Sequence, residues 1–461
     1  MKKPLPPPDW VQLMTEYAGE GPERLMRVFS SGRAVDEKGR YLHWDQMRHR
    51  KPPDELTLDE WWVGTAASRM NNARSLPFIG TDGNPFRFTN VDTIQEMVHR
   101  IDQQASGRIQ TDEIVSTVGT RNRYLVSSLI EEAITSSLLE GAATTRRVGK
   151  QLLRTGRAPR DTSECMILNN YLALQRAEEL ASSGEPLTPD LVLELHRIVT
   201  DGTLDDQSEA GRLQQPGDKR VAIYWTDGQL LHRPPPVDQL PSRLERLCAF
   251  ANGDTGEGFL HPVVQAVLIH FWIGYDHPFA DGNGRTARAL FYWSMLRSGY
   301  WLAEYISISS ILRKAPAKYA RSYLYTETDS NDVTYFIIYQ LEVIKRAISS
   351  LRRYLTRKSG EIAQVERAMR GVPGLNHRQL AILSNALRDP DNYFTFAGQQ
   401  RIHRVAYQSA RTDLLSLETL GLLKKVQVGR TFEFWPADGL EDRIRGLSDG
   451  STSTGYQTVL S

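Results

Sequence analysis

The chain of 461 residues contains only two cysteines, Cys165 and Cys248, and both stand among apolar neighbours. So few cysteines exclude a disulfide framework and the spacing of a zinc site, and they are typical of buried thiols in a reducing compartment. Uncharged apolar runs are also short, and none approaches the roughly 20 residues that span a bilayer. No apolar stretch of the kind found in a signal peptide follows the N-terminal Met-Lys-Lys. We therefore expect a cytoplasmic protein.

An excess of charge of one sign is missing as well. The chain has 56 Lys and Arg against 55 Asp and Glu, so no overall field selects nucleic acid or an anionic membrane as its main partner. Hydrophobic residues make up 40% and charged residues 24%, which is ordinary for a globular protein. This length is too great for one compact core, and we expect two or three domains.

Apolar residues recur at spacings of three and four over about 95–370, which predicts a mainly α-helical fold. Within it, residues 124–141 predict an amphipathic helix that Gly141 ends. Two strand-like runs around Asp227-Gly228 predict a β-hairpin over 220–236. The expected divisions are an N-terminal helical module (1–95), a helical core (96–354), a linker (355–374), a helix–helix–hairpin segment (375–440) and a disordered tail (441–461).

The segment His277-Pro-Phe-Ala-Asp-Gly-Asn-Gly-Arg-Thr-Ala-Arg288 lies between two helical patterns and has the features of a phosphate-handling catalytic loop. Gly282, Asn283 and Gly284 precede the second helix, where backbone N–H groups and the helix dipole can form a nest for phosphate oxygens. Two arginines, Arg285 and Arg288, stand three apart on that helix and can reach one anion together.

The same loop supplies a metal ligand and a base. Asp281 offers carboxylate oxygens beside the phosphate nest, which suits Mg²⁺ because this ion takes one or two carboxylates together with phosphate oxygens. The imidazole of His277, with an ordinary pKa of about 6.5, can accept a proton near neutral pH. Each feature alone has a structural reading, as a turn, a helix end or a solvated face, but their combination within one short loop indicates an active site.

This loop resembles the signature of the Fic family of nucleotidyltransferases, His-x-Phe-x-[Asp/Glu]-Gly-Asn-Gly-Arg-x-x-Arg, and every specified position is matched. The resemblance covers roughly residues 120–345. It implies a helical bundle core with a β-hairpin flap, and transfer of AMP from ATP onto Ser, Thr or Tyr hydroxyls of a protein target. The metal it implies is Mg²⁺ or Mn²⁺. The identity of the target is not readable from the sequence, and the chain itself is one candidate.

The resemblance also implies roles for individual residues. His277 would be the general base for the target hydroxyl, and Asp281 would hold the metal. Asn283 and the amides of Gly282 and Gly284 would bind the α- and β-phosphates. Arg285 and Arg288 would neutralise the β- and γ-phosphates, while Phe279 would pin the loop into the core.

The predicted hairpin is similar to the flap with which this family lays an extended target segment beside the site by strand addition. Its inner edge would be Leu231, His232, Arg233 and Pro234. Tyr319 is a candidate neighbour of the adenine, although a helix-packing tyrosine explains that position equally well.

A second motif of the family, [Ser/Thr]-x-x-x-Glu-[Gly/Asn], is matched by Ser136, Glu140 and Gly141. The resemblance implies an inhibitory helix in which Glu140 pairs with Arg288 and takes the place of the γ-phosphate. ATP would then bind in an unproductive pose. The predicted activity is therefore conditional.

The order helix, helix, hairpin over 375–440 is typical of a winged helix. Basic residues lie on its expected recognition helix, the approach to that helix and the wing: Arg401, Arg404, Arg411, Lys424, Lys425 and Arg430. Residues 376–436 nevertheless hold eight Lys and Arg against five Asp and Glu, a net of only +3. DNA binding is therefore possible but not favoured over homodimerisation or target docking.

Three alternatives to AMP transfer stay open. The same site could remove AMP from a modified target, with Glu140 aligning a water, or could use another nucleotide. A reading of a different class is a DNA-binding regulator in which the Fic core senses a nucleotide. Labelled ATP, with and without a change at Glu140, separates AMP transfer from the DNA-binding regulator.

Overall fold

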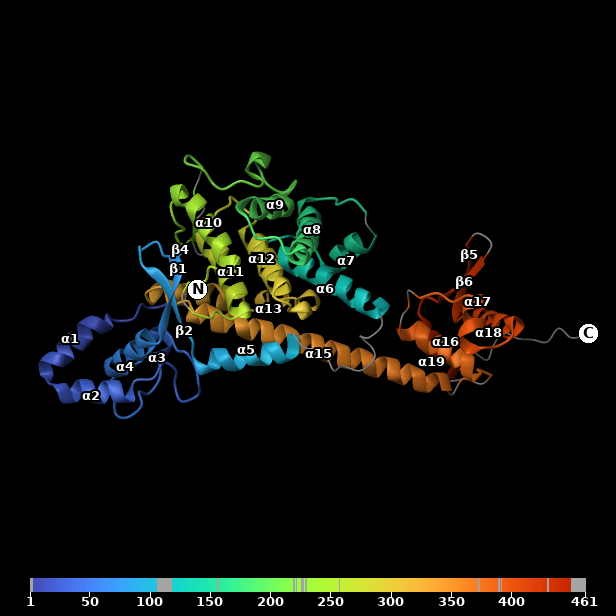
Figure 1. Cartoon of the computed structure of the whole chain (residues 1–461), viewed down its shortest axis with the longest axis horizontal. Coiled ribbons are helices and arrows are strands. Elements are labelled where there is room, and N and C mark those ends of the chain that lie inside the picture. The colour runs from blue at the N-terminus through green and yellow to red at the C-terminus, as the bar shows by residue number, and fades with distance from the viewer. Residues whose placement is uncertain are drawn as a thin grey trace, which may run out of the picture. The chain divides into compact units, whose positions relative to one another are not determined.

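A computed structural model describes residues 3–105, 118–155, 157–218, 220, 222–224, 228, 230–256, 258–370, 372, 374–388, 390, 392–428 and 431–448. The chain divides into two compact units (Figure 1). The first unit comprises Met1–Ile109 and Ser127–Ser349, and the second comprises Gln110–Val126 and Ser350–Ser461. Helices dominate the described residues, so the expected mainly α-helical class is confirmed. No helix in the described part of the chain is long and apolar enough to cross a membrane.

The N-terminal region begins with four helices: α1 (Trp10–Glu20), α2 (Pro22–Ser31), α3 (Trp44–Met47) and α4 (Leu58–Asn71). Buried aromatic and aliphatic side chains join them, among them Trp44, Trp61 and Trp62. Helices α2 and α4 approach so closely that a Cβ on Gly32 would stand 2.5 Å from the carbonyl oxygen of Gly64. Only glycine allows this backbone contact, which holds the N-terminal helices together.

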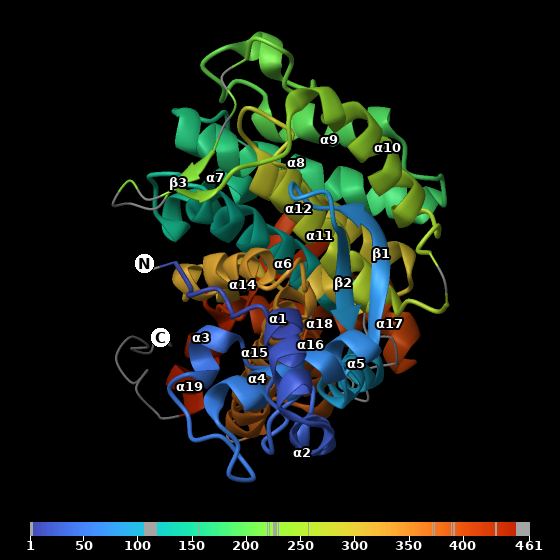
Figure 2. The same cartoon turned by 90° about the vertical axis from the view of Figure 1, so that its left-hand side faces the viewer.

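A β-hairpin that the sequence did not predict follows these helices. Strands β1 (Ala73–Ile79) and β2 (Pro85–Thr89) pair antiparallel, with an irregularity between Ser75 and Ile79. Pro77 lies in that interval, and because proline donates no hydrogen bond it tolerates such a bulge. Figure 2 shows the hairpin beside helix α11 (Pro262–Asp276), where Phe78 packs on Trp272.

The N-terminal region is therefore not a separate helical module, because it shares one compact unit with the core. A buried polar cluster adds to the packing of the hairpin. Arg69, which is 3% exposed, donates to the hydroxyl of Tyr335 over 2.7 Å and to the carbonyl of Leu42 over 2.9 Å. The hydroxyl of Tyr335 donates in turn to Asp329 over 2.6 Å. Such a buried charge needs these partners, so the cluster holds residues 34–89 against the core.

The core of the first unit is built around α11 and α12 (Asn283–Arg297), which pack against each other. Nearly every residue of α11 is buried, as expected for a helix that is apolar on all sides. Helices α8 (Thr162–Ser183) and α9 (Pro189–Thr200) cover α12, and α10 (Leu240–Ala251) covers α11. The unit also contains α5 (Asp92–Ala105), α7 (Arg146–Thr155), α13 (Ser309–Leu312), α14 (Pro316–Thr328) and, from Ser127 on, α6 (Val118–Leu139).

The predicted hairpin over 220–236 is present as two short antiparallel strands, β3 (Ile223–Tyr224) and β4 (Leu230–His232). Most of its turn lies outside the described residues. Helix α15 runs from Thr334 to Arg370, so residues 355–370 of the expected linker are helical instead. The many charged residues there are typical of an exposed helix face as well as of a linker, which explains the error.

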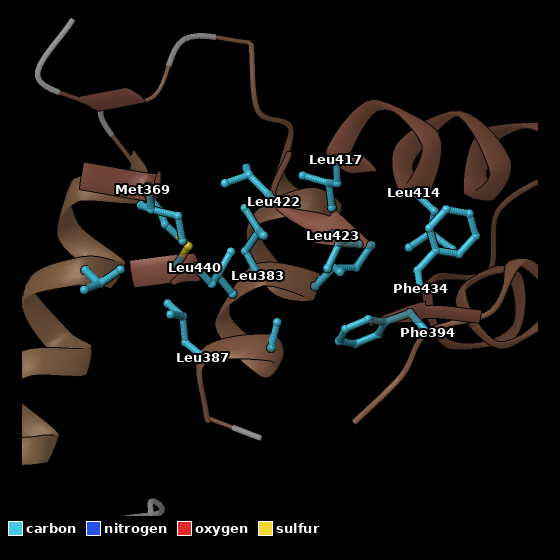
Figure 3. Close-up of a cluster of buried hydrophobic side chains, with 14 residues drawn as sticks. Met369, Leu383, Leu387, Phe394, Leu414, Leu417, Leu422, Leu423, Phe434 and Leu440 are labelled. Carbon is cyan, nitrogen blue, oxygen red and sulfur yellow. The ribbon is translucent and has the colours of Figure 1, made fainter. Parts of the chain in front are cut away.

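The second unit contains α16 (His377–Arg388), α17 (Phe396–His403), α18 (Tyr407–Thr419), β5 (Leu423–Val428), β6 (Thr431–Pro436) and α19 (Leu440–Ser448). Figure 3 shows the apolar core that these elements share with the end of α15, including Met369, Leu383, Leu414 and Phe434. Helix α19 corrects the expected disordered tail over 441–448, because Leu440 and Ile444 are buried in this core. Residues 449–461 lie outside the described part.

Candidate active site

His277 ends helix α11 in an unusual backbone conformation. Its φ of 45° and ψ of 55° lie in the left-handed region, which a residue other than glycine adopts rarely. Its N–H still donates to the carbonyl of Ile273 over 3.0 Å, which closes the helix. The preceding Asp276 is buried and accepts from Arg243 over 2.9 and 2.6 Å. The end of α11 is thus held from both sides, so that the chain turns sharply where the predicted base stands.

Arg220, which the sequence did not single out, clamps the same helix end. Its guanidinium donates to the carbonyls of Asp276 and His277, each over 2.6 Å, and to that of Pro235 over 3.0 Å. A cation at a helix C-terminus also interacts favourably with the helix dipole. Because Pro235 lies three residues after the end of β4 at His232, Arg220 ties the flap segment to the helix end that carries His277.

The imidazole of His277 is half-buried, and its Nδ1 has no contact with solvent. Burial lowers its pKa to about 4, with smaller effects of the Gly274 carbonyl, His232, Glu140 and Arg220. The ring is therefore neutral at pH 7 and able to accept a proton. A bound polyphosphate would raise this pKa toward neutrality, because negative charge nearby favours the imidazolium form. His277 is therefore unprotonated before a nucleotide binds, and its basicity would rise once the phosphates are present.

The loop after His277 is braced by Phe279 and Asn283. The backbone N–H of Phe279 donates to Oδ1 of Asn283 over 3.0 Å, and Nδ2 of Asn283 donates back to the carbonyl of Phe279 over 2.8 Å. Asn283 is 3% exposed, so its amide serves the loop itself before any phosphate. Phe279 is fully buried and occupies the core position that the sequence indicated.

His196 of α9 completes this brace, and the sequence missed it. Its ring stacks on Phe279 with centroids 3.8 Å apart and planes 8° apart. Its Nδ1 accepts from the N–H of Gly211 over 3.0 Å, which leaves Nε2 to donate to the carbonyl of Asp281 over 2.9 Å. Burial lowers the pKa of His196 to about 4, so the neutral tautomer required by these contacts is the stable one. His196 therefore fixes the backbone on which the predicted metal ligand stands.

Gly282 caps α12 with a φ of 79°, and a Cβ at this position would stand 2.7 Å from Cγ2 of Thr200. Both the backbone conformation and the space demand glycine here. Asp281, by contrast, is exposed, and its Oδ2 accepts from Nη2 of Arg285 over 3.0 Å. Its carboxylate is oriented by an arginine yet open to an incoming ligand.

The two predicted phosphate arginines have different partners. Arg285 is 0% exposed and donates to the carbonyl of Val199 over 2.6 Å as well as to Asp281. It therefore braces the loop, and sharing of a phosphate with Arg288 stays a prediction. Arg288 is 1% exposed and donates from Nε to Oγ of Ser136 over 2.9 Å and from Nη2 to Oε1 of Glu140 over 2.8 Å.

Glu140 also lies against the start of α12. A Cβ on Gly284 would stand 2.2 Å from Oε1 of Glu140 and 3.1 Å from Nη1 of Arg288. The carboxylate thus occupies the helix N-terminus, the position that favours an anion. Burial alone would lower the pKa of Arg288, but Glu140, then Tyr319 and Glu132, outweigh it and leave this pKa above its usual value. Gly141 follows Glu140 with a φ of 96° and ends the helix as expected.

The flap residues and Tyr319 surround this centre. Leu231 and His232 are buried, and His232 donates from Nε2 to the carbonyl of Tyr275 over 2.7 Å while its Nδ1 stands 2.9 Å from Oε1 of Glu327. Arg233 is exposed and Pro234 is buried. The hydroxyl of Tyr319 lies 2.9 Å from Nε2 of His270. That contact supports the packing reading of Tyr319, and contact with adenine stays a prediction.

The donor set of the site fits a hard metal ion only together with a nucleotide. The described residues contain no group of three or more His, Cys, Asp or Glu that could hold a metal by protein ligands alone. Asp281 offers one accessible carboxylate beside the start of α12, and Mg²⁺ commonly takes one or two carboxylates with substrate phosphates and waters. The site is therefore suited to a metal ion that binds together with the phosphates of a nucleotide.

Comparisons with known proteins agree with this geometry. A family model described as Fic/DOC family matches residues 186–295, from α9 to α12. Those residues are therefore similar to the Fic/DOC family. Protein adenylyltransferase Fic of Nematostella vectensis is 28% identical over 211 residues, covering 45% of this chain and 46% of that protein. The Drosophila melanogaster protein of the same name is 28% identical over 220 residues, covering 46% and 42%.

The chain thus spans less than half the length of these curated relatives. Among solved structures, a Fic family protein from Desulfovibrio desulfuricans G20 aligns with 76% of this chain and 97% of its own, at a TM-score of 0.49 and 17% sequence identity.

Proposed function

We propose that this chain is a protein adenylyltransferase that moves AMP from ATP onto a Ser, Thr or Tyr hydroxyl of a protein target. The single observation that carries the proposal is the loop from His277 to Arg288, in which a neutral base, an exposed carboxylate and a helix N-terminus meet at one place. The names of the curated relatives support the same reaction.

In this reaction His277 accepts the proton of the target hydroxyl on Nε2, since its Nδ1 is buried. The hydroxyl oxygen forms a bond to the α-phosphorus of ATP, and the bond from that phosphorus to the bridging oxygen of the β-phosphate breaks. Pyrophosphate leaves with the electron pair of that bond. The N–H groups at the start of α12 and the guanidinium of Arg288 orient and neutralise the phosphates, so that positioning and electrostatics supply most of the rate.

Asp281 is the residue that would hold Mg²⁺ or Mn²⁺ beside the phosphates. The ion would supply charge neutralisation on the α- and β-phosphates. Arg285 orients the Asp281 carboxylate through its Nη2, and His196 positions the backbone of the same residue through its carbonyl. The protein contribution to metal binding is thus an oriented carboxylate on a rigid loop.

The enzyme is, in this proposal, held inactive by Glu140. The carboxylate pairs with Arg288 and lies against Gly284, where a γ-phosphate would otherwise meet the arginine. Ser136 accepts from the Nε of Arg288 and fixes the guanidinium plane. ATP that enters beside Glu140 cannot use Arg288 and therefore binds out of line for attack.

Transfer of label from [α-³²P]ATP tests the proposal. Glu140→Gly should raise label on the chain itself or on added proteins at least tenfold, and His277→Ala in that background should abolish it while ATP still binds. Glu185→Gly, an exposed loop glutamate, is the matched control and should behave as wild type. If Glu140→Gly binds ATP without transferring label, AMP transfer is refuted. Release of AMP from a pre-labelled protein, or label from another nucleotide, would then identify the alternative chemistry.

The flap provides the target with a place to lie. Strand β4 pairs with β3 on one side, and an extended target segment added to its other edge would run beside Leu230, His232 and Arg233 toward His277. Exposed Tyr224 and Leu230, at 60% and 36%, give that surface apolar contact area. The target is in this view an unfolded or loop segment of a protein.

The second unit is proposed to be a winged-helix domain, because α16, α17, α18 and the β5–β6 hairpin occur in that order around one core. Its surface carries Ile402 and Tyr407, 67% and 49% exposed, close in sequence to the exposed Arg404 and Arg411. This mixture favours a protein contact, such as a second copy of the chain, over a DNA duplex. Light scattering should detect dimers that Ile402→Glu dissociates, whereas salt-sensitive binding of duplex DNA by a monomer would overturn this assignment.

A further inference from the structure

Three polar residues stand four apart on one side of α6 and at its end: Glu132 and Ser136 in the helix, and Glu140 directly after it. Residues at this spacing lie along one side of a helix. Ser136 and Glu140 contact Arg288, and Glu132 lies two turns before Glu140. The family signature that identifies the inhibitory segment begins at Ser136, so it assigns no role to Glu132.

Glu132 is nevertheless among the most completely bonded carboxylates of the described residues. It is 2% exposed and accepts from three donors: the hydroxyl of Ser309 on Oε1 over 2.5 Å, and on Oε2 the hydroxyl of Ser307 over 2.6 Å and the N–H of Ser309 over 3.1 Å. Thr135 on the same helix adds a contact of 3.0 Å to the hydroxyl of Ser307. A carboxylate is buried at a high free-energy cost unless its oxygens are satisfied in this way.

The segment that holds Glu132 belongs to the catalytic core. Ser307 and Ile308 lie between the short helix Trp301–Tyr305 and α13, which begins at Ser309. They are pinned to α12, since the N–H of Ile308 donates to the hydroxyl of Tyr292 over 3.1 Å. Tyr292 follows Arg288 by one turn of α12. Glu132 therefore anchors α6 to the same part of α12 from which Arg288 reaches Glu140.

We propose that Glu132 is a positioning residue for inhibition. It fixes the position of α6 relative to α12, so that Glu140 meets Arg288. Ser307 and Ser309 form a clasp for it. When the clasp is lost, Ile130 and Ile134 still pack α6 against Leu152 and Ile167, so the helix stays folded but shifts or moves relative to α12. Arg288 is then released to phosphate more often. The inference rests on the proposed function, because it concerns the regulation of that site.

The test compares Glu132→Ala with Glu131→Ala in the full chain. Glu131 is the neighbouring carboxylate of α6, but it pairs with Arg146 and lies 3.8 Å from Lys150 of α7, so its loss leaves the clasp intact. Glu132→Ala should raise label transfer from ATP about tenfold, within the span expected for the loss of one coupling between sites. Glu131→Ala should leave it unchanged. Glu132→Gln, whose amide oxygen can accept from Ser307 and from the N–H of Ser309 while its NH2 donates to the hydroxyl of Ser309, should restore most of the inhibition.

A general structural role predicts a different pattern. In the Glu140→Gly background the inhibitor is already gone, so Glu132→Ala should add no further activity there. A tenfold rise in that background as well, or no rise above wild type while Glu140→Gly is active, overturns the proposal. If Glu132→Ala fails to fold, Ser307→Ala with Ser309→Ala removes the two hydroxyl donors instead and is judged by the same criteria.

Amide hydrogen exchange keeps the proposal testable even if Glu140→Gly transfers no label, which would be a failure of the proposed function and not of the clasp. Amides of residues 128–140 should exchange faster in Glu132→Ala than in Glu131→Ala. Equal exchange in the two variants refutes the clasp.

Discussion

His196 lies outside the signature loop and yet should be indispensable to it. In His196→Ala, the buried N–H of Gly211 loses its acceptor and the carbonyl of Asp281 loses its donor. Each unsatisfied group costs about 1–3 kcal/mol, and the lost stacking on Phe279 costs about 0.5–1.5 kcal/mol. We expect the free energy of unfolding of the first unit to fall by about 3–5 kcal/mol.

The effect on transfer should exceed the effect on ATP binding. Without His196 the loop backbone at Asp281 can move by an ångström or so, and a misplacement of that size costs about 100-fold in rate. The assay is steady-state AMP transfer in the Glu140→Gly background, where inhibition does not mask the chemistry. His196→Ala should lower kcat about 100-fold and change the Kd for ATP less than fivefold.

Two further variants separate positioning from general instability. The amide of His196→Gln can still reach the carbonyl of Asp281, so it should recover part of kcat. His99→Ala, on the exposed face of α5, removes a histidine without touching the loop and should leave kcat unchanged. A folded His196→Ala protein with kcat within twofold of its parent would refute the role of this side chain.

Three other outcomes follow from the same site. Arg220→Ala leaves the carbonyls of Asp276 and His277 without their donor and should lower kcat tenfold or more. Arg220→Lys should restore little of this activity, because one ammonium cannot replace the two-pronged guanidinium. Equal kcat for the parent and both variants would contradict this role. Asp281→Asn should raise the Mg²⁺ concentration for half-maximal AMP transfer at least tenfold. The control is Asp190→Asn, which changes an exposed carboxylate outside the loop and should leave this concentration unchanged. An unchanged Mg²⁺ requirement in Asp281→Asn would exclude Asp281 as the ligand. Finally, burial lowers the pKa to about 3 or 4 at four histidines, His43, His196, His270 and His277. Because the unfolded chain binds these protons first, the free energy of unfolding should fall as pH drops from about 6.5 to 4, by up to about 1.4 kcal/mol per pH unit for each histidine. Asp329, whose pKa is raised to about 6, takes up a proton in the folded state and offsets one of them; urea unfolding midpoints that stay level across this range would refute the expectation.

The features that could be predicted from the sequence are those encoded by spacing along the chain. Gly282 predicts the start of the helix at Asn283. The structure explains why this residue is glycine, since its φ is positive and a Cβ would lie too close to Thr200. Ser136 and Glu140 share a helix face because they stand four apart, so both could be predicted to reach one partner. Their contact with Arg288, which lies 148 residues after Glu140, came from the family resemblance and not from spacing.

The residues that escaped prediction act from a distance in sequence. His196 precedes Asp281 by 85 residues, and Arg220 precedes His277 by 57. Nothing local distinguishes a histidine inside an amphipathic helix such as α9 from any other buried side chain. The hairpin β1–β2 was missed for a local reason, since Pro77 stands inside β1 and a proline within such a run argues against a strand. Tertiary contacts decide the roles of His196 and Arg220.

Under the proposed function, Arg288 explains how inhibition and catalysis would share one site. A guanidinium that is 1% exposed cannot be left without an anion, because an unpaired buried charge costs several kcal/mol. Glu140 meets this need in the structure through its contact with Arg288. Under the proposed function the phosphates of ATP would meet it in the productive state, so that nucleotide would replace one anion with another. A partner protein or a change at Glu132 that moved α6 would then act by altering which anion Arg288 holds.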